Sequence, residues 1–242
     1  MRYKTNNGDK ETNAKLNGAN QHFLPKVKAF SNGEVAGIYK EKMEKAQSET
    51  GVEVNFYILM PTHVHQLLAI ESNKDLEEYF RRLNTSFAKS VMKICDKNSG
   101  LLLFPDKQVF SDRPTITPQF DLEQYLITLS YQYHNGDHLK LTEIGGGEYR
   151  KSAAWEYENG FRTIENDSLL IMLGMTWKEL SAMLNLPTIQ RMKAIHEFAQ
   201  RQDSENIKKL FRINPRKPFT SKPLPGSKAN PLTRILADVR LR

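Results

Sequence analysis

The sequence predicts an α+β protein, because a hairpin of two strands lies between two helical segments in its first half. The segment 52–60, VEVNFYILM, is rich in β-branched and aromatic residues and predicts a strand. Pro61 and Thr62 form a turn, after which the segment 63–70, HVHQLLAI, returns as the partner strand. The segment 33–48, which precedes this hairpin, predicts a helix.

A long amphipathic helix is predicted after the hairpin. Asn73 or Asp75 can cap its start, and its apolar residues recur at helical spacing until about residue 97. The following segment, 98–120, is interrupted by three prolines and a glycine, so it predicts a loop with short strands.

A further helix is predicted over residues 121–135, where Asp121 and Gln124 have the spacing of a capping box. One stripe of apolar side chains on this helix is expected to face the core. Tyr131 and Asn135 share a different face, one turn apart. A tyrosine on that face is either exposed to solvent or used in function.

Two histidines in the predicted strand 63–70 indicate chemistry. His63 and His65 are one residue apart, so their side chains point to the same face of the strand. Two neutral imidazoles and the amide oxygen of Asn135 supply three ligands for a divalent ion, which would polarise a phosphodiester. Tyr131 beside that ion can then attack phosphorus and hold it covalently. The alternative is that both histidines are polar residues on a solvated face.

Positive charge is concentrated at the C-terminal end. The formal net charge is +7, and residues 203–242 hold ten basic and three acidic side chains, so the remainder is close to neutral. Prolines interrupt this segment, as is typical of a flexible arm that binds a polyanion; the alternative is a solubilising tail. Nucleic-acid contacts are predicted for basic residues of the long helix, the loop and the tail: Arg81, Arg82, Lys89, Arg113, Lys208, Lys209, Arg212, Arg216 and Lys217.

The segment LMPTHVHQLL (59–68) resembles the MPNHVHLL motif of the single-tyrosine HUH transposases, in particular the REP-associated tyrosine transposases. YLITLSYQYHNG (125–136) is similar to the helix of that family with the pattern Y-I-H-x-N-P. Further segments resemble helices and loops of the same family: FRRLNTSFAKS (80–90), LFPDKQVF (103–110), EYRKSAAWEYENG (148–160) and DSLLIMLG (167–174). The resemblance runs from about residue 50 to residue 175.

The resemblance implies a ferredoxin-like antiparallel sheet of the HUH endonuclease type, with helices packed on one face and the histidine strand at its centre. It implies that His63, His65 and Asn135 bind Mg²⁺ or Mn²⁺ and that Tyr131 is the nucleophile. The implied activity is cleavage and transfer of single-stranded or hairpin DNA through a 5′-phosphotyrosine, which leaves a free 3′-hydroxyl. The alternatives are a domesticated protein that binds DNA hairpins without cleaving them, and an RNA-binding protein.

The sequence departs from the family pattern at four positions. Thr62 and Gln66 replace an asparagine and an aliphatic residue, and Tyr133 and Gly136 replace a histidine and a proline. The metal-ligand and nucleophile positions keep their residue types.

Four parts are predicted along the chain: a disordered arm (1–20), a nuclease domain (21–145), a helical extension (146–202) and the basic flexible tail (203–242). In the extension, TWKELSAMLNLP (176–187) resembles the first helix and turn of a helix-turn-helix, although a plain packing helix fits equally well.

The chain is expected to be cytoplasmic and associated with the nucleoid, as a monomer or a homodimer without a membrane partner. Its start has no signal-peptide core, and no apolar run reaches the length of a membrane span. The single cysteine, Cys95, excludes an internal disulfide and a cysteine-based zinc cluster.

Overall fold

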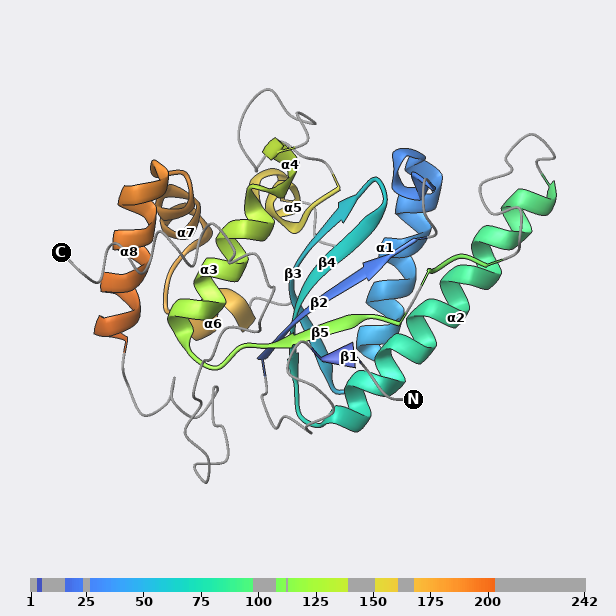
Figure 1. Cartoon of the computed structure of the whole chain (residues 1–242), viewed down its shortest axis with the longest axis horizontal. Coiled ribbons are helices and arrows are strands. Elements are labelled where there is room, and N and C mark those ends of the chain that lie inside the picture. The colour runs from blue at the N-terminus through green and yellow to red at the C-terminus, as the bar shows by residue number, and fades with distance from the viewer. Residues whose placement is uncertain are drawn as a thin grey trace, which may run out of the picture.

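A five-stranded sheet with the strand order β1-β5-β2-β4-β3 organises the chain (Figure 1). The computed structural model describes residues 4–5, 16–23, 27–97, 108–111, 113–138, 151–160 and 168–202. Its strands are β1 (Lys4–Thr5), β2 (Leu16–His22), β3 (Val52–Met60), β4 (His63–Ile70) and β5 (Thr115–Pro118). Its helices are η1 (Ala29–Ser31), α1 (Gly33–Ser48), α2 (Asn73–Lys97), α3 (Leu122–Tyr133), α4 (Asn135–His138), α5 (Ala153–Asn159), α6 (Ser168–Leu173), α7 (Trp177–Leu184) and α8 (Thr188–Arg201).

Four strands and two helices have the ferredoxin-like arrangement. The chain order β2-α1-β3-β4-α2-β5 is a βαββαβ unit, and its strands lie antiparallel in the order β5-β2-β4-β3. β1 adds a short parallel pairing to the outer side of β5. The predicted α+β fold with an antiparallel sheet is therefore confirmed. The strand of the two histidines, β4, lies inside the sheet as predicted.

The local signals in the sequence give the hairpin and its flanking helices correctly. β3 and β4 coincide with the predicted segments 52–60 and 63–70, and α1 and α2 coincide with the helices predicted from 33 and from 73. Within the described ranges, no helix combines the length and the apolar content needed to cross a bilayer.

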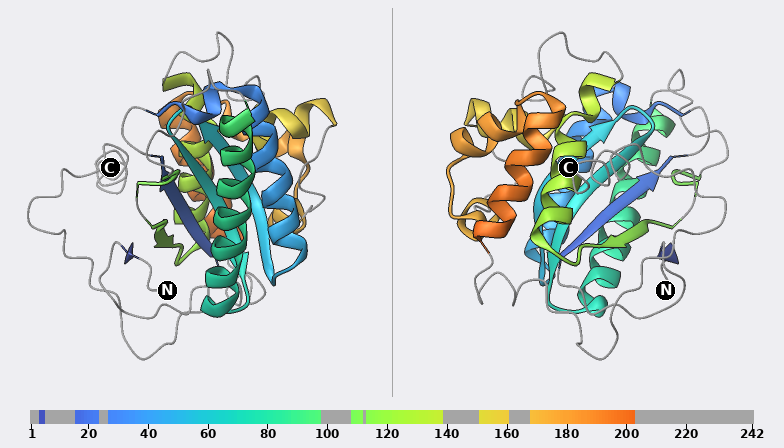
Figure 2. Two further views of the ribbon diagram at one scale, coloured as in Figure 1. Left: turned by 90° about the vertical axis from the view of Figure 1, so that its right-hand side faces the viewer. Right: turned by 60° about the vertical axis from the view of Figure 1, so that its left-hand side comes forward.

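The helices lie on both faces of the sheet. From β4, the buried Gln66 donates through Nε2 to the Tyr79 hydroxyl of α2 at 3.1 Å, so this face packs against α1 and α2. The neighbouring His65 points to the opposite face, where its ring meets Tyr131 of α3 (Figures 1 and 2). The prediction that helices pack on one face of the sheet is right for α1 and α2. α3 instead lies on the opposite face, because the chain after β5 crosses to that side.

The boundary of the predicted N-terminal arm also requires correction. Residues 16–20, predicted as disordered, lie in β2, which pairs with β4 on one side and with β5 on the other. The segment is polar and contains Gly18, so its strand character comes from pairing on both edges rather than from β-propensity. Gly18 also makes room, because a Cβ there would lie 3.2 Å from Gln119 Nε2.

The helix predicted over 121–135 ends earlier than expected. Asp121 caps α3 by accepting from the Gln124 backbone N–H at 2.7 Å, but the Gln124 side chain accepts from the Phe120 N–H instead of closing a capping box. α3 ends at Tyr133, and Asn135 begins the short helix α4. Asn135 nevertheless follows Tyr131 by about one turn.

A largely buried ion pair joins α5 to α1, and a hydrogen bond joins α5 to β3. Lys40 of α1 donates to Glu156 of α5 at 2.7 Å, and the buried Tyr57 hydroxyl of β3 donates to the same carboxylate. Beside it, the Leu59 N–H of β3 donates to the Lys151 carbonyl at 2.9 Å. These contacts place Lys151 and α5, which belong to the predicted extension, at the outer edge of β3.

Replacing Glu156 by alanine is expected to lower the free energy of unfolding by about 3 kcal/mol, because Lys40 and Tyr57 would lose their shared acceptor in a largely buried place. Urea unfolding followed by circular dichroism measures the change. Glu44→Ala removes an exposed carboxylate from the helix that carries Lys40 and is expected to change stability by less than about 0.5 kcal/mol. Equal losses in the two variants would contradict this prediction.

Candidate active site

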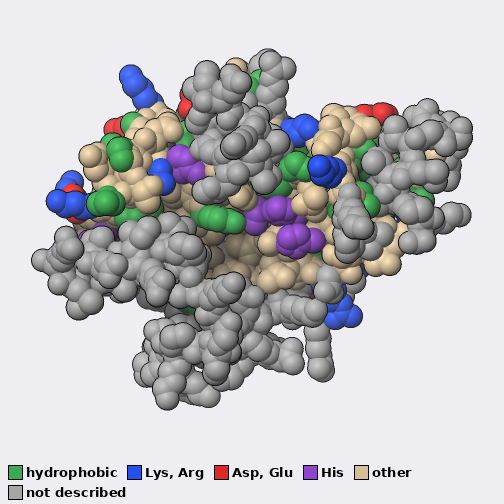
Figure 3. All heavy atoms as spheres, turned by 45° about the horizontal axis from the view of Figure 1, so that its top comes forward, with side chains coloured by type: hydrophobic (Ala, Val, Ile, Leu, Met, Phe, Trp, Pro, Cys, Tyr) green, Lys and Arg blue, Asp and Glu red, His purple; other side chains and the backbone are tan. Residues whose placement is uncertain are grey.

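The register of two neighbouring strands brings four polar side chains together. His65 of β4 lies opposite Asn20 of β2, and His63 lies opposite His22. Residues paired across strands point to the same face, and this is the face that α3 crosses. The His22 and His63 rings stack with centroids 4.8 Å apart. Figure 3 shows histidine side chains side by side at the surface on this face.

The two histidines of β4 turn the same ring nitrogen toward each other. His63 Nε2 lies 3.0 Å from His65 Nε2. Ligands at right angles around an ion, each about 2.1 Å from it, are separated by about 3.0 Å, so this spacing fits two neighbouring positions of an octahedral site. Thr62 Oγ1 lies 3.0 Å from His63 Nδ1 and can accept a hydrogen bond from the Nδ1–H, which leaves the Nε2 lone pair of His63 available to a metal.

Both histidines are neutral at physiological pH. Burial, and after it the neighbouring His22, lowers the pKa of His63 to about 4. Burial, then His63 and then His22, lowers the pKa of His65 to about 3. Neutral imidazole is the form that binds metal ions, so the pair is ready for a divalent cation without first losing protons.

Asn135 supplies a third donor close in sequence to Tyr131. Its side chain is buried, and its Nδ2 has no hydrogen-bond partner among the described residues. Because the oxygen and nitrogen of an amide exchange places by a simple flip, this unsatisfied position suits an amide oxygen that binds a cation. Within the described part of the chain, no group of three or more His, Cys, Asp or Glu side chains could hold a metal. The two imidazoles are therefore the metal donors that the structure brings together, and the amide of Asn135 is a candidate third donor on the helix that follows α3.

Tyr131 lies at the rim of this set. It is 40% exposed, whereas the other tyrosines of α3 are buried. Its ring meets the His65 ring edge-on, with centroids 5.8 Å apart. α3 is held in this orientation from the sheet, because Asn55 of β3 donates to the Tyr125 hydroxyl at 3.1 Å. The Tyr131 side chain thus lies beside the His65 imidazole and is open to solvent.

Two residues of this face, Asn20 and His22, are not among the site residues that the sequence predicts. β2, which carries Asn20 and His22, begins inside the segment predicted to be disordered, and its partner strands are distant in sequence. A weak signal was present, since Asn20 and His22 alternate in the same way as His63 and His65. His22 is further held through its carbonyl, which accepts from the Ser111 N–H at 3.2 Å.

The predicted nucleic-acid contacts fall into three places. Arg113 is exposed and lies shortly after Ser111, so it belongs to the end of the sheet that carries His22. Arg81, Arg82 and Lys89 lie on the side of α2 that faces away from the sheet, and the structure does not bring them to the histidines. The predicted tail contacts lie outside the described residues: Lys208, Lys209, Arg212, Arg216 and Lys217.

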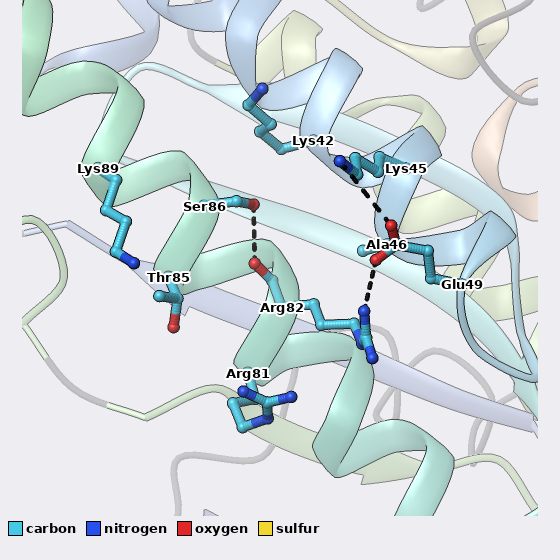
Figure 4. Close-up of a pocket in the computed structure, with 9 residues that line it drawn as sticks. All are labelled: Lys42, Lys45, Ala46, Glu49, Arg81, Arg82, Thr85, Ser86 and Lys89. Atoms are coloured by element: carbon cyan, nitrogen blue, oxygen red, sulfur yellow. Dashed lines mark hydrogen bonds and ion pairs between the residues drawn. The ribbon is translucent and has the colours of Figure 1, made fainter.

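The basic residues of α2 line a groove against α1, with a volume of about 360 Å³ (Figure 4). Lys42 and Lys45 of α1 add to it. Acidic neighbours reduce its charge, because Arg82 donates to Glu78 and to Glu49, both at 2.6 Å, and Arg81 also pairs with Glu78. These pairs are exposed, so salt and nucleic-acid phosphates can compete with them.

Comparison with known proteins finds distant similarity to two solved structures. No family model and no curated protein sequence matches the chain. It is similar to the structure of a REP-associated tyrosine transposase bound to a REP hairpin, with TM-score 0.48 and 11% identity, over 65% of this chain and 88% of that one. It is also similar to a protein assigned as a transposase from Deinococcus radiodurans R1, with TM-score 0.37 and 14% identity, over 50% of this chain and 90% of that one. At these values, neither similarity assigns the chain to a family.

Acidification is expected to destabilise the fold through His63 and His65. Folding lowers both pKa values from 6.5, so between about pH 6.5 and pH 4 the unfolded state binds more protons. The contribution to stability is complete above pH 6.5 and is lost as the pH falls. Urea unfolding at pH 7 and pH 5 should show a smaller loss for His65→Gln than for the native chain. Tyr131→Phe keeps both histidines and should lose as much as the native chain; equal losses in all three proteins would contradict this prediction.

Proposed function

We propose that the chain is a metal-dependent endonuclease and strand transferase for single-stranded DNA with hairpins, of the single-tyrosine HUH type. The observation that carries the proposal is the exposed Tyr131 beside His65, whose Nε2 lies 3.0 Å from that of His63. An exposed phenol next to a paired set of metal ligands is an arrangement suited to phosphoryl transfer. The sequence resemblance to the REP-associated transposases names the same residues.

In the proposed reaction, the Tyr131 oxygen attacks a phosphodiester at phosphorus. A phenol–phosphorus bond forms, the bond to the 3′-oxygen breaks, and the product is a 5′-phosphotyrosine with a free 3′-hydroxyl. The phenol gives up one proton and the leaving oxygen takes up one, so no proton is gained or lost overall. A 3′-hydroxyl of another strand can reverse the step and rejoin DNA without an external energy source.

The chain's own residues have separable tasks. His63, His65 and Asn135 would hold Mg²⁺ or Mn²⁺, which supplies Lewis-acid polarisation of the phosphate and stabilises charge on its oxygens. Thr62 orients His63 through Nδ1. α3 fixes the direction of Tyr131, and the 40% exposure of that side chain leaves the approach from solvent open to a flexible strand.

A covalent-adduct assay tests the nucleophile. Labelled single-stranded DNAs with varied hairpins and flanks, mixed with the full chain and Mn²⁺, should yield an adduct that survives denaturation. Tyr131→Phe is expected to reduce it by roughly 1,000-fold or more, and EDTA or His65→Ala should reduce it strongly. Tyr39→Phe, which removes a buried hydroxyl of α1 that has no hydrogen-bond partner among the described residues, should retain the adduct. Tight hairpin binding without an adduct would replace the proposal by the non-cleaving alternative, and preference for matched RNA hairpins would favour an RNA-binding role.

Metal binding is tested without reference to activity. Isothermal titration with Mn²⁺ should show one site in the native chain. His63→Ala and His65→Ala are expected to abolish measurable binding, and Asn135→Ala should weaken it by about 10-fold or more. His22→Ala should weaken binding less than Asn135→Ala, because His22 Nε2 already lies at hydrogen-bond distance, 3.2 Å, from Asn20 Nδ2. Equal binding in the native chain and His65→Ala would overturn the metal assignment.

A further inference from the structure

α7 and α8 lie at the edge of the molecule farthest from α2, whereas α6, which precedes them, contacts β3 (Figure 1). α6, α7 and α8 each contribute two buried side chains to the core: Leu169, Leu173, Leu180, Leu184, Met192 and Ile195. These positions recur at helical spacing on each helix, so each buries one face and leaves another uncovered. The proposed cleavage chemistry uses none of the three helices.

The connection between α7 and α8 is a tight turn. It runs from the C-cap Asn185 to Pro187, a three-residue length that is characteristic of the helix-turn-helix motif. Arg191, in the first turns of α8, donates through Nη1 to the Leu184 carbonyl at 2.9 Å and to the Leu186 carbonyl at 3.1 Å. The Arg191 side chain of α8 therefore caps the C-terminal end of α7 and holds the two helices together.

The start of α8 presents an uncovered polar and apolar surface. Thr188, Ile189, Gln190 and Lys193 are all exposed, and Ile189 is 70% exposed, although it is a large apolar residue. In a helix-turn-helix, the N-terminal residues of the second helix contact base edges in the major groove. Glutamine pairs with adenine, an apolar side chain contacts the thymine methyl, and lysine contacts guanine or phosphate. The four side chains thus match the chemistry of a major-groove reader.

The charge of the adjoining chain favours a polyanion over a protein as the partner. After α8 the sequence continues into residues 203–242, which hold ten basic and three acidic side chains. Phosphate contacts by such residues supply sequence-independent affinity, and a recognition helix adds selectivity.

α8 and the turn before it are attached directly to α3, the helix of the candidate nucleophile. The Tyr133 hydroxyl of α3 donates to Asn185 Oδ1 in the turn at 3.2 Å. Farther along, His196 Nδ1 of α8 lies 3.1 Å from Glu123 Oε2 of α3. Tyr133 is two residues from Tyr131, so α8 and Tyr131 are held at a fixed spacing.

We infer that α7 and α8 form a helix-turn-helix that binds duplex DNA sequence-specifically, with Gln190, Ile189 and Lys193 of α8 in the major groove. The inference does not require cleavage by Tyr131, because it concerns a separate surface. If both functions exist, the fixed attachment through α3 sets the distance between the duplex that is read and the single strand that is cut.

Selection from a library of short linear DNA duplexes with a random centre tests the inference. The full native chain should enrich one motif at physiological salt. In a gel-shift assay, Gln190→Ala should bind the enriched duplex about 10-fold more weakly and bind unrelated duplexes as before. Gln200→Ala changes an equally exposed glutamine near the other end of the same helix, and it should bind like the native chain. Circular dichroism melting verifies that both variants are folded.

Two further variants distinguish this inference from the proposed cleavage activity. Tyr131→Phe should enrich the same motif as the native chain, since the tyrosine is not part of the reading surface. Lys193→Ala should weaken binding and reduce its dependence on salt. Failure of the native chain to enrich any duplex, or equal binding by Gln190→Ala and Gln200→Ala, would overturn the helix-turn-helix assignment while leaving the adduct assay unaffected.

Discussion

The alternation of side chains along β4 is the constraint on which the rest of the structure depends. β4 is paired on both edges, so each of its side chains points either toward α1 and α2 or toward α3. Gln66 uses the first face and donates to Tyr79, whereas His65 uses the second and meets Tyr131. A register shift of one residue would exchange these faces and place the imidazoles among the apolar side chains of two helices. The same register therefore determines both the core and the candidate site.

The direction of α3 follows from polar contacts at both of its ends. Asn55 binds the hydroxyl of the buried Tyr125, and Tyr133 donates to Asn185 in the turn that follows α7. Hydrogen bonds of this kind fix orientation more than they add stability, since an unpaired buried hydroxyl would be costly in any other arrangement. Tyr131 lies between these two buried tyrosines on the uncovered side of the helix. Tyr131 is thus exposed because Tyr125 and Tyr133 direct the other sides of α3 toward the interior.

Local patterns in the sequence were sufficient for the elements but not for their arrangement. The hairpin of β3 and β4 and the helices α1 and α2 have strong periodicity, and their predicted limits agree with the structure. β2 was missed in part because its polar residues become a strand only through pairing with two partners far along the chain. For the site, spacing alone placed His63 and His65 on one face and set Tyr131 one turn from Asn135. Their roles as ligands and nucleophile rest on the proposed function.

The basic residues show that the number of charges in the sequence does not reveal where those charges lie in the structure. The sequence groups Arg81 and Arg82 with Arg113 as cations available to a nucleic acid. In the structure, Arg81 and Arg82 are engaged by Glu78 and Glu49 on the far side of the helix layer, whereas Arg113 belongs to the end of the sheet near His22. The candidate chemical centre itself is built from neutral imidazoles and an amide. A nucleic acid held there must therefore gain most of its electrostatic attraction from surfaces beyond the centre, which separates the residues that bind the strand from those that would cut it.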